Sequence, residues 1–327
     1  MSDARGGPAP GAHEVAGSGR DARATGGPPQ EQSAERGALR RHRIPAPATG
    51  DAPLAGTEPL IDAHAHFLCD VGPRADAAAV DAARLRAGER IGITWHVSSV
   101  LGSWGRTSPT YFASPADVTS GNDAQYAVVD AHPSRVRAWL HVNPNHTQHA
   151  IAEIRRGVAR GAIGLKLSAS RRADDRLLDP VIEEAARHRL PVLHHIWQHR
   201  RRDWGGQEAS DAVELGRLAA RHPTVTFLLA HIGGGGDWAH TNPAVRDLPN
   251  VMLDLSGSGV DRGMLDEALA AVGARRLVWG ADLTLCTGLA KLRALEVIGL
   301  SPSETSDVRW RNAVRMFPPG SFPGLSA

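Results

Sequence analysis

The sequence predicts an α/β protein built as a single (β/α)8 TIM barrel with a disordered N-terminal tail. From Leu60 onward, short β-branched or leucine-rich runs alternate with amphipathic stretches rich in Ala, Leu and Arg. This alternation gives roughly eight strand–helix units in about 270 residues, which is the period and size of such a barrel. Several predicted strands also end on a polar side chain, and the strand ends of a barrel converge on one mouth.

Residues 1–57 differ in composition from the rest of the chain. Gly, Ala, Pro, Arg and Ser dominate this stretch, and aromatic or β-branched side chains are scarce. Such a segment buries too little apolar surface to offset its chain entropy. We therefore expect a disordered tail over 1–57 and a barrel over 58–327. The basic run at 40–43 is interpreted as solvated tail rather than as a nucleic-acid-binding arm.

The expected elements follow one another along the barrel region. The expected strands centre on Leu60–Phe67, Ile93–Val100, Arg137–Asn143, Ala162–Ser168, Pro191–Ile196, Val225–His231, Val251–Ser256 and Leu277–Asp282. Helices are expected between them, for example Thr147–Arg160, Pro180–His188, Ser210–Arg221 and Arg262–Val272. A doubly wound open sheet is the main competing architecture, but no Gly-x-Gly-x-x-Gly follows the first strand. The stretch Leu101–Thr119 has little helical periodicity and is expected to be a long loop, serving as a lid or substrate wall or as variable surface.

Composition narrows the class of protein. The formal net charge of +2 gives no electrostatic argument for nucleic acid as a partner. The two cysteines, Cys69 and Cys286, are too few for a disulfide framework, which fits a reducing compartment. No apolar run approaches the length of a membrane span, and the N-terminus lacks the apolar segment of a secretory signal. We expect a cytoplasmic protein with a small-molecule substrate and no nucleic-acid or membrane partner. A homodimer is among the assemblies that the outer helices of a barrel support.

The segment Asp62-Ala63-His64-Ala65-His66 is the strongest chemical signal. Residues two apart in a strand share a face, so Asp62, His64 and His66 are expected to point the same way. Two imidazoles on one face can bind one cation. Asp62 lies deeper on the same face and is expected to orient the first histidine, His64. The alternative is a pair of solvent-facing histidines on an edge strand. The residues of the opposite face are expected to pack against helices: Ile61, Ala63, Ala65 and Phe67.

Three other predicted strands end on a side chain that binds metals or protons. His195 ends the fifth strand, His231 the sixth and Asp282 the eighth. Because these ends converge in a barrel, we expect them to face His64 and His66. Imidazoles and a carboxylate suit one divalent ion, with Zn²⁺ as the leading candidate and Mn²⁺ or Fe²⁺ as alternatives.

The fifth strand leaves one choice open. His194 and His195 are neighbours, so they face opposite sides of the strand, and one of them reaches the barrel interior. We favour His195 as the ligand, although a register shift of one residue reverses the choice.

Together these segments resemble the amidohydrolase superfamily. The resemblance rests on Asp62-Ala63-His64-Ala65-His66, Pro191-Val192-Leu193-His194-His195, Ala230-His231-Ile232-Gly233-Gly234 and Trp279-Gly280-Ala281-Asp282, in this order. It is closest to the amidohydrolase-related branch that contains aminocarboxymuconate-semialdehyde decarboxylase and related decarboxylases, lactonases and hydrolases. The late Asn312–Phe317 segment resembles the closing helix of that branch, so the resemblance covers about residues 58–318.

The resemblance implies a role for each motif residue. His64, His66 and His195 would bind a single metal ion, and Asp282 would be both a ligand and a proton shuttle. His231 would polarise the substrate or hold the nucleophilic water. These roles are chemically coherent, because a metal lowers the pKa of its bound water and a neighbouring carboxylate accepts the proton.

Two departures from the branch affect the substrate side. Where the branch often has Thr-Gly after the fifth-strand histidine, Ile196-Trp197-Gln198-His199 follows here, so Trp197 is a candidate substrate wall. Lys166 ends the fourth strand, and three roles stay open for it: a carboxylated bridge between two metals, a substrate contact, or a structural role.

Other polar and aromatic residues are secondary candidates. Trp104, Arg106 and Trp238 stand in presumed mouth loops and are candidate substrate contacts. Asp254 and Ser256 end the seventh strand, where they line the mouth or form a polar layer inside the barrel.

The leading functional hypothesis is a metal-dependent hydrolase of a small amide, ester or lactone, with Asp282 as general base. The alternative is a metal-dependent, non-oxidative decarboxylase of an aromatic or enoic acid, with Arg106 and Lys166 as candidate carboxylate anchors. A third hypothesis is a barrel-shaped binding protein without activity.

Overall fold

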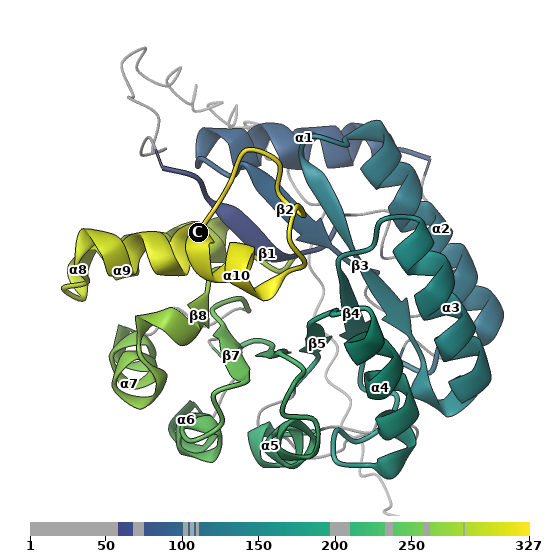
Figure 1. The fold of residues 1–327 in the computed structure, drawn as a ribbon. Helices are drawn as coiled ribbons and strands as arrows, with labels where there is room; N and C mark the ends of the chain where they lie inside the picture. The colour runs from purple at the N-terminus through teal and green to yellow at the C-terminus, as the bar shows by residue number, and fades with distance from the viewer. Residues whose placement is uncertain are drawn as a thin grey trace, which may run out of the picture. The chain divides into compact units, whose positions relative to one another are not determined.

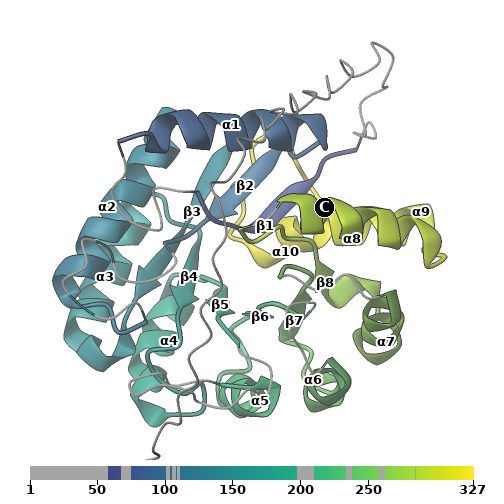
Figure 2. The same ribbon diagram turned by 180° about the vertical axis from the view of Figure 1, so that it is seen from behind.

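A computed structural model shows eight parallel strands in the order β1 to β8, with helices outside the strands (Figure 1). Figure 2 shows the same ring of helices from behind. The structure describes residues 58–67, 75–100, 104, 108, 111–196, 210–232, 238–257, 262–283 and 285–327. The expected tail, residues 1–57, lies outside the described residues.

Each strand is short and is followed by a helix. The strands are β1 (Ile61–Ala65), β2 (Trp95–Ser98), β3 (Val136–Val142), β4 (Gly164–Leu167), β5 (Val192–His194), β6 (Phe227–Leu229), β7 (Val251–Asp254) and β8 (Leu277–Val278). The helices are α1 (Ala77–Arg90), α2 (Pro115–Ala131), α3 (Thr147–Ala159), α4 (Asp179–Arg187), α5 (Ala212–Arg221), α6 (Trp238–Val245), α7 (Arg262–Val272), α8 (Leu285–Val297), α9 (Pro302–Ser306) and α10 (Asn312–Met316). Within these described ranges, no helix is both long and apolar enough to cross a membrane.

The predicted (β/α)8 barrel is confirmed, and each observed strand lies within one residue of its predicted range. The prediction was wrong at the end of the stretch Leu101–Thr119, because α2 already begins at Pro115. The hydroxyl of Ser114 accepts a hydrogen bond from the backbone N–H of Asp117, and Pro115 occupies the first helical position. These are standard helix-start signals, and they outweigh the weak periodicity of the stretch.

The strands bury two apolar faces, as expected for a parallel sheet. Alternate strand residues point outward and pack against helix residues. This outer cluster includes Leu140, Leu165, Val192, Phe227 and Leu253 from strands, with Ile154, Val181 and Leu215 from helices. The intervening strand residues point into the barrel. They fill its lower interior, which is the part away from the carboxyl ends of the strands, and Trp139, Leu193 and Leu228 belong to this separate apolar cluster.

The C-terminal segment contributes to this interior cluster. Met316 of α10 and the following Phe317 and Phe322 pack with the strand residues that fill the lower interior. Figure 1 shows α10 and the last residues, in yellow, lying across the strands. Because the lower interior is apolar and filled, polar chemistry is confined to the opposite end, where the strands finish.

β1 carries one irregularity that decides which of its side chains face inward. Asp62 pairs with His96 of β2, but Ala65 pairs with Ser98, so three steps along β1 match two steps along β2. Such a bulge inserts one extra residue and changes the face of the side chains that follow. The strict alternation predicted for Asp62, His64 and His66 is therefore wrong. Ile61 and Ala63 also lie in the interior cluster, not against helices as predicted.

The small residue at Gly164 makes room for the largest interior side chain. A Cβ atom at Gly164 would lie 2.2 Å from the indole ring of Trp139. We expect Gly164→Ala to lower the free energy of unfolding by about 1–3 kcal/mol, because the indole has to move within a filled interior. Urea unfolding measures this loss. In a Trp139→Phe background the same substitution should cost less, and an equal cost in both backgrounds would contradict the steric explanation.

Candidate metal centre

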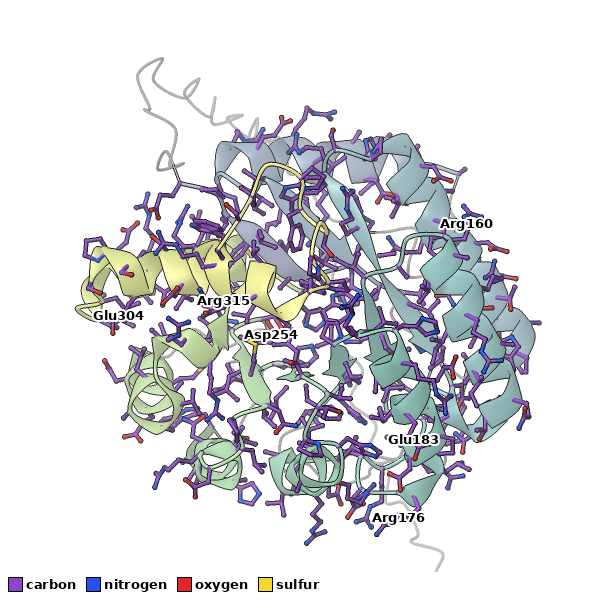
Figure 3. All side chains as sticks on the ribbon, in the orientation of Figure 1. Arg160, Arg176, Glu183, Asp254, Glu304 and Arg315 are labelled. Atoms are coloured by element: carbon purple, nitrogen blue, oxygen red, sulfur yellow. The ribbon has the colours of Figure 1, made fainter. Side chains whose placement is uncertain are left out.

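Buried polar side chains gather where the strands end. His64 and His66 belong to β1 and its end, Lys166 to β4 and Asp254 to β7. His195, His231 and Asp282 directly follow or closely follow β5, β6 and β8. Figure 3 shows Asp254 near the middle of the barrel, whereas Arg160, Arg176 and Glu304 lie on the outer helices. The predicted strand-end residues thus share one end of the barrel.

Three of these residues form a group that fits a divalent ion. One ligand atom from each of His64, His66 and Asp282 lies within 4.8 Å of the others. The two Nε2 atoms of the histidines are 3.2 Å apart, and His66 Nε2 is 3.4 Å from Asp282 Oδ1. Two imidazole nitrogens and a carboxylate are a borderline donor set that suits Zn²⁺, Mn²⁺ or Fe²⁺.

Asp254, rather than Asp62, orients His64. The Nδ1–H of His64 donates to Asp254 Oδ2 at 2.6 Å, inside a fully buried pair. The hydroxyl of Ser256 donates to the same carboxylate. A carboxylate on Nδ1 fixes the tautomer that leaves the Nε2 lone pair for a metal ion.

The role predicted for Asp62 is therefore wrong. Because Asp62 precedes the bulge, its carboxylate points away from the site, where Oδ2 lies 3.1 Å from His96 Nδ1. Its Oδ1 accepts a hydrogen bond from the backbone N–H of Ala281 at 2.9 Å. Asp62 thus joins β1 to β2 and to the end of β8.

The second histidine is oriented by the backbone. The Nδ1–H of His66 donates to the carbonyl oxygen of Ser99 at 2.7 Å. Both histidines therefore use Nδ1 as a donor and turn their Nε2 lone pairs toward each other. Two lone pairs 3.2 Å apart repel unless a cation or a proton donor lies beside them. The Lys166 ammonium, 3.2 Å from His64 Nε2, is one such group, and a divalent ion would satisfy both lone pairs at once.

His195 and His231 extend the site as a connected set of rings. The His231 ring stacks on His64 with centroids 5.0 Å apart and meets His195 edge-on at 4.6 Å. His231 Nε2 is 3.4 Å from Asp282 Oδ2. Among the described residues, the group within 4.8 Å does not include His195, so the structure places His195 beside His231 rather than within that closest group. His194, its neighbour, donates from Nδ1 to the His195 carbonyl oxygen.

Two of the site residues have unusual backbone conformations. His231 has φ of 62° and Asp282 has φ of 55°. A side chain in the left-handed region costs roughly 1 kcal/mol or more, and such strain is concentrated at functional sites. The turn at the end of β6 and the turn at the end of β8 thus hold these two side chains against each other.

Burial and charge set the protonation states. Burial lowers the pKa of the imidazoles of His64, His66, His195 and His231, to about 4 for His66. Burial raises the pKa of the Asp282 carboxyl, but the surrounding His64, His231 and His66 lower it more, and the result is a pKa of about 2. At neutral pH the site therefore presents neutral imidazoles and an ionised carboxylate, the states in which both bind metal.

The residues predicted as substrate contacts lie in different parts of the structure, and that role stays a prediction for each of them. Lys166 is buried, and its Nζ lies 3.2 Å from His64 Nε2. The described contacts of Trp104 and Trp238 are with apolar clusters outside the metal group. Trp197 and Arg106 lie outside the described residues. Tyr111, which the sequence placed only in a candidate wall, stacks on His195 with centroids 5.7 Å apart.

We expect Asp254→Asn to weaken metal binding about 10–100-fold, because His64 loses the carboxylate that fixes its ring. Titration of the metal-free protein with Mn²⁺ or Zn²⁺ measures the dissociation constant. Gly280→Ala should act in the same direction, since its Cβ would lie 2.7 Å from Asp254 Oδ1 and 2.9 Å from His64 Cβ. The exposed Asp130→Asn is the control, and unchanged affinity in both site variants would rule out this role for Asp254.

The metal-free protein should lose stability as the pH falls below 6.5. Burial lowers the pKa of His141 to about 3 and of His194 to about 4, whereas the unfolded chain takes up a proton near pH 6.5. The unfolded state therefore binds more protons throughout this window, so stability is lost progressively as the pH drops from about 6.5 to about 3. At pH 5 each histidine removes about 2 kcal/mol of unfolding free energy.

Urea unfolding at pH 7 and pH 5 measures this dependence. His141→Asn should reduce the difference between the two pH values, because it removes one of the two groups whose pKa burial lowers. An identical pH dependence in the His141 variant would contradict the prediction.

Comparisons with known proteins agree with the barrel fold. A family model described as amidohydrolase matches residues 61–318. Among solved structures, 5-carboxyvanillate decarboxylase from Sphingomonas paucimobilis has a TM-score of 0.56 and 17% identity, covering 79% of this chain and 98% of that chain. A dihydroxybenzoic acid decarboxylase from Polaromonas sp. JS666, with bound manganese and an inhibitor, has a TM-score of 0.60 and 16% identity, covering 79% and 96%.

A third similar structure has a different activity. It is 4-oxalomesaconate hydratase from Rhodopseudomonas palustris, with a TM-score of 0.58 and 14% identity, covering 79% of this chain and 95% of that chain. No functionally curated protein matches the chain in sequence. At such low identities the solved structures show the fold alone, whereas the family model spans almost the whole described barrel. The chain belongs to the amidohydrolase family of enzymes.

Proposed function

We propose that the protein is a divalent-metal-dependent, non-oxidative decarboxylase of an aromatic or enoic carboxylic acid. The buried Lys166 ammonium beside the His64–His66–Asp282 group carries this proposal, because it is a fixed cation suited to a carboxylate substrate. Two of the similar structures are decarboxylases of aromatic acids, which supports the same reaction class. The hydrolase that the sequence analysis placed first lacks comparable support and becomes the alternative outcome of the test.

Four residues would hold the metal ion. His64, His66 and Asp282 supply the close group, and we propose His195 as a further ligand from the neighbouring strand end. A divalent ion bound there supplies a Lewis acid that neutralises charge developing on substrate oxygens. Zn²⁺ remains a candidate on donor chemistry, and the manganese in the Polaromonas enzyme makes Mn²⁺ the first ion to test.

Lys166 is the proposed anchor for the substrate. Burial lowers its pKa to about 8, so the ammonium is still mostly protonated at pH 7. Its Nζ lies 3.2 Å from His64 Nε2, beside the close group. With the Nε2 lone pair of His64 given to a metal ion, the ammonium would be available to the carboxylate of the substrate, which is the anion a buried cation needs.

Asp282 and His231 are the proposed proton-handling pair. Decarboxylation breaks the bond between carbon and the carboxylate, leaves the electron pair on carbon and requires a proton there. Asp282 is ionised in the resting site, so it takes up a proton from a substrate hydroxyl group or from solvent and delivers it to that carbon, and CO2 leaves. His231, held 3.4 Å from Asp282 Oδ2, orients the carboxylate and contacts the substrate oxygen.

The expectations about partners and location stay predictions. They comprise a small-molecule substrate, no nucleic-acid or membrane partner, a homodimer and a cytoplasmic location. The proposed chemistry requires the substrate alone among them.

The test is release of CO2 from a panel of hydroxybenzoic and enoic acids by protein reconstituted with Mn²⁺ or Zn²⁺. We expect activity with metal, loss on chelation, and at least a 100-fold lower kcat in Asp282→Asn, because the proton carrier is removed. Lys166→Met should raise KM for the acids, and Lys166→Arg should retain part of the affinity.

A parallel panel of amides, esters and lactones serves as the control for reaction class. Metal-dependent hydrolysis that needs Asp282, without CO2 release from any acid, would replace the decarboxylase with the hydrolase. Equal activity of metal-stripped and reconstituted protein would reject both.

A further inference from the structure

Asp282 lies in the turn after β8, where few backbone contacts join the chain to β1. In the described part of the chain, an isolated bridge links Ala65 and Asp282, and the backbone N–H of Ala63 donates to the carbonyl oxygen of Trp279 at 3.1 Å. The backbone N–H of Asp282 donates to the carbonyl oxygen of His64 at 2.6 Å. One hydrogen bond fixes the amide, but it does not fix the direction of a backbone held in the left-handed region. The carboxylate therefore needs a second restraint.

Arg84 of α1 supplies contacts on the other side of this turn. Its Nη2 donates to the carbonyl oxygen of Asp282 at 2.7 Å, and its Nη1 donates to the carbonyl oxygen of Leu283 at 2.9 Å. The planar guanidinium thus holds two successive carbonyl groups in one fork, a geometry that a lysine ammonium does not reproduce. The side chain is only 11% exposed.

Arg84 is itself held in place from β1. Its Nη2 is 3.7 Å from Asp62 Oδ2, and its guanidinium lies over the ring of Phe67 at 5.7 Å from the centroid. The same Asp62 carboxylate accepts the N–H of Ala281, directly before Asp282. Asp62 and Arg84 therefore hold the turn at both of its ends. Asp62 accepts a hydrogen bond from the backbone amide of Ala281, and Arg84 donates to the carbonyl oxygens of Asp282 and Leu283.

We propose that Arg84 is a positioning residue for the reaction. It fixes the left-handed turn at Asp282 so that the carboxylate stays between His66 and His231, 3.4 Å from each imidazole. It contacts Asp282 through the backbone carbonyl oxygen, so it acts on the position of the carboxylate. The activity part of this inference rests on the proposed decarboxylation, whereas the metal-binding part rests only on the His64–His66–Asp282 group. A misplacement of about 1 Å in such a group is enough to cost roughly 100-fold in rate.

The experiment compares wild-type protein with Arg84→Ala, Arg84→Lys and the control Arg86→Ala. Arg86 lies two residues further along α1 and is exposed. Each protein is titrated with Mn²⁺ by electron paramagnetic resonance, then assayed for CO2 release, with thermal melting as the measure of folding. Methylguanidinium at millimolar concentration is added to Arg84→Ala as a replacement for the missing group.

We expect Arg84→Ala to weaken Mn²⁺ binding about tenfold or more and to lower kcat by about 10–100-fold with KM within about twofold. Methylguanidinium should restore both in Arg84→Ala and change neither in Arg86→Ala. Arg84→Lys keeps the charge but not the fork, so it should show the same defect while remaining folded.

Wild-type Mn²⁺ affinity and kcat in Arg84→Lys would overturn the inference, as would losses in Arg84→Ala that follow only the melting temperature and do not respond to methylguanidinium. If wild-type protein releases no CO2 from any acid, the proposed function fails. The Mn²⁺ titration with and without methylguanidinium then still decides the role of Arg84.

Discussion

The hydrogen bond from His64 to Asp254 is the interaction on which the site depends. Both groups are fully buried, and an unpaired charge or imidazole at this depth would cost several kcal/mol,. The neighbouring strands are adapted to the pair: Ser256 donates to the same carboxylate, and Gly280 leaves the space that a side chain would take. The bulge in β1 is required as well, because it turns His64 inward. The bulge in β1, Ser256 after β7 and Gly280 after β8 thus all serve this one hydrogen bond.

Inside the barrel, apolar and polar side chains occupy different ends of the axis. The lower interior is filled by Trp139, Leu193, Leu228 and the C-terminal aromatic residues, which exclude water from below. The upper interior holds imidazoles that burial keeps neutral and the ionised Asp282 carboxylate. Because the filling below is rigid, the polar groups above it keep fixed positions, which is the condition for electrostatic preorganisation.

The barrel was predictable from sequence because it is encoded locally. Short β-branched or leucine-rich runs mark the strands and alternate with amphipathic helical stretches. Each observed strand falls close to its predicted range. His195, His231 and Asp282 became candidates for a similar reason, since each of them ends an apolar run. The partner of His64 was not, because a bulge is a property of strand pairing and two-residue periodicity in β1 assigns Asp62 to the wrong face. The role of Arg84 was not predictable from the sequence, because nothing in the sequence distinguishes it from the other arginines of the same Ala- and Arg-rich helix.

The seam between β1 and β8 has a consequence for how the protein is made. His64 and His66 lie near the start of the barrel in sequence, and Asp282 lies near its end, so the first and last strands meet at the metal group. A chain still emerging from the ribosome carries both histidines for most of its synthesis without the carboxylate that completes the centre. Asp282 reaches the two histidines only when the end of the barrel meets its start, so a metal ion captured by an incomplete chain lacks the carboxylate ligand.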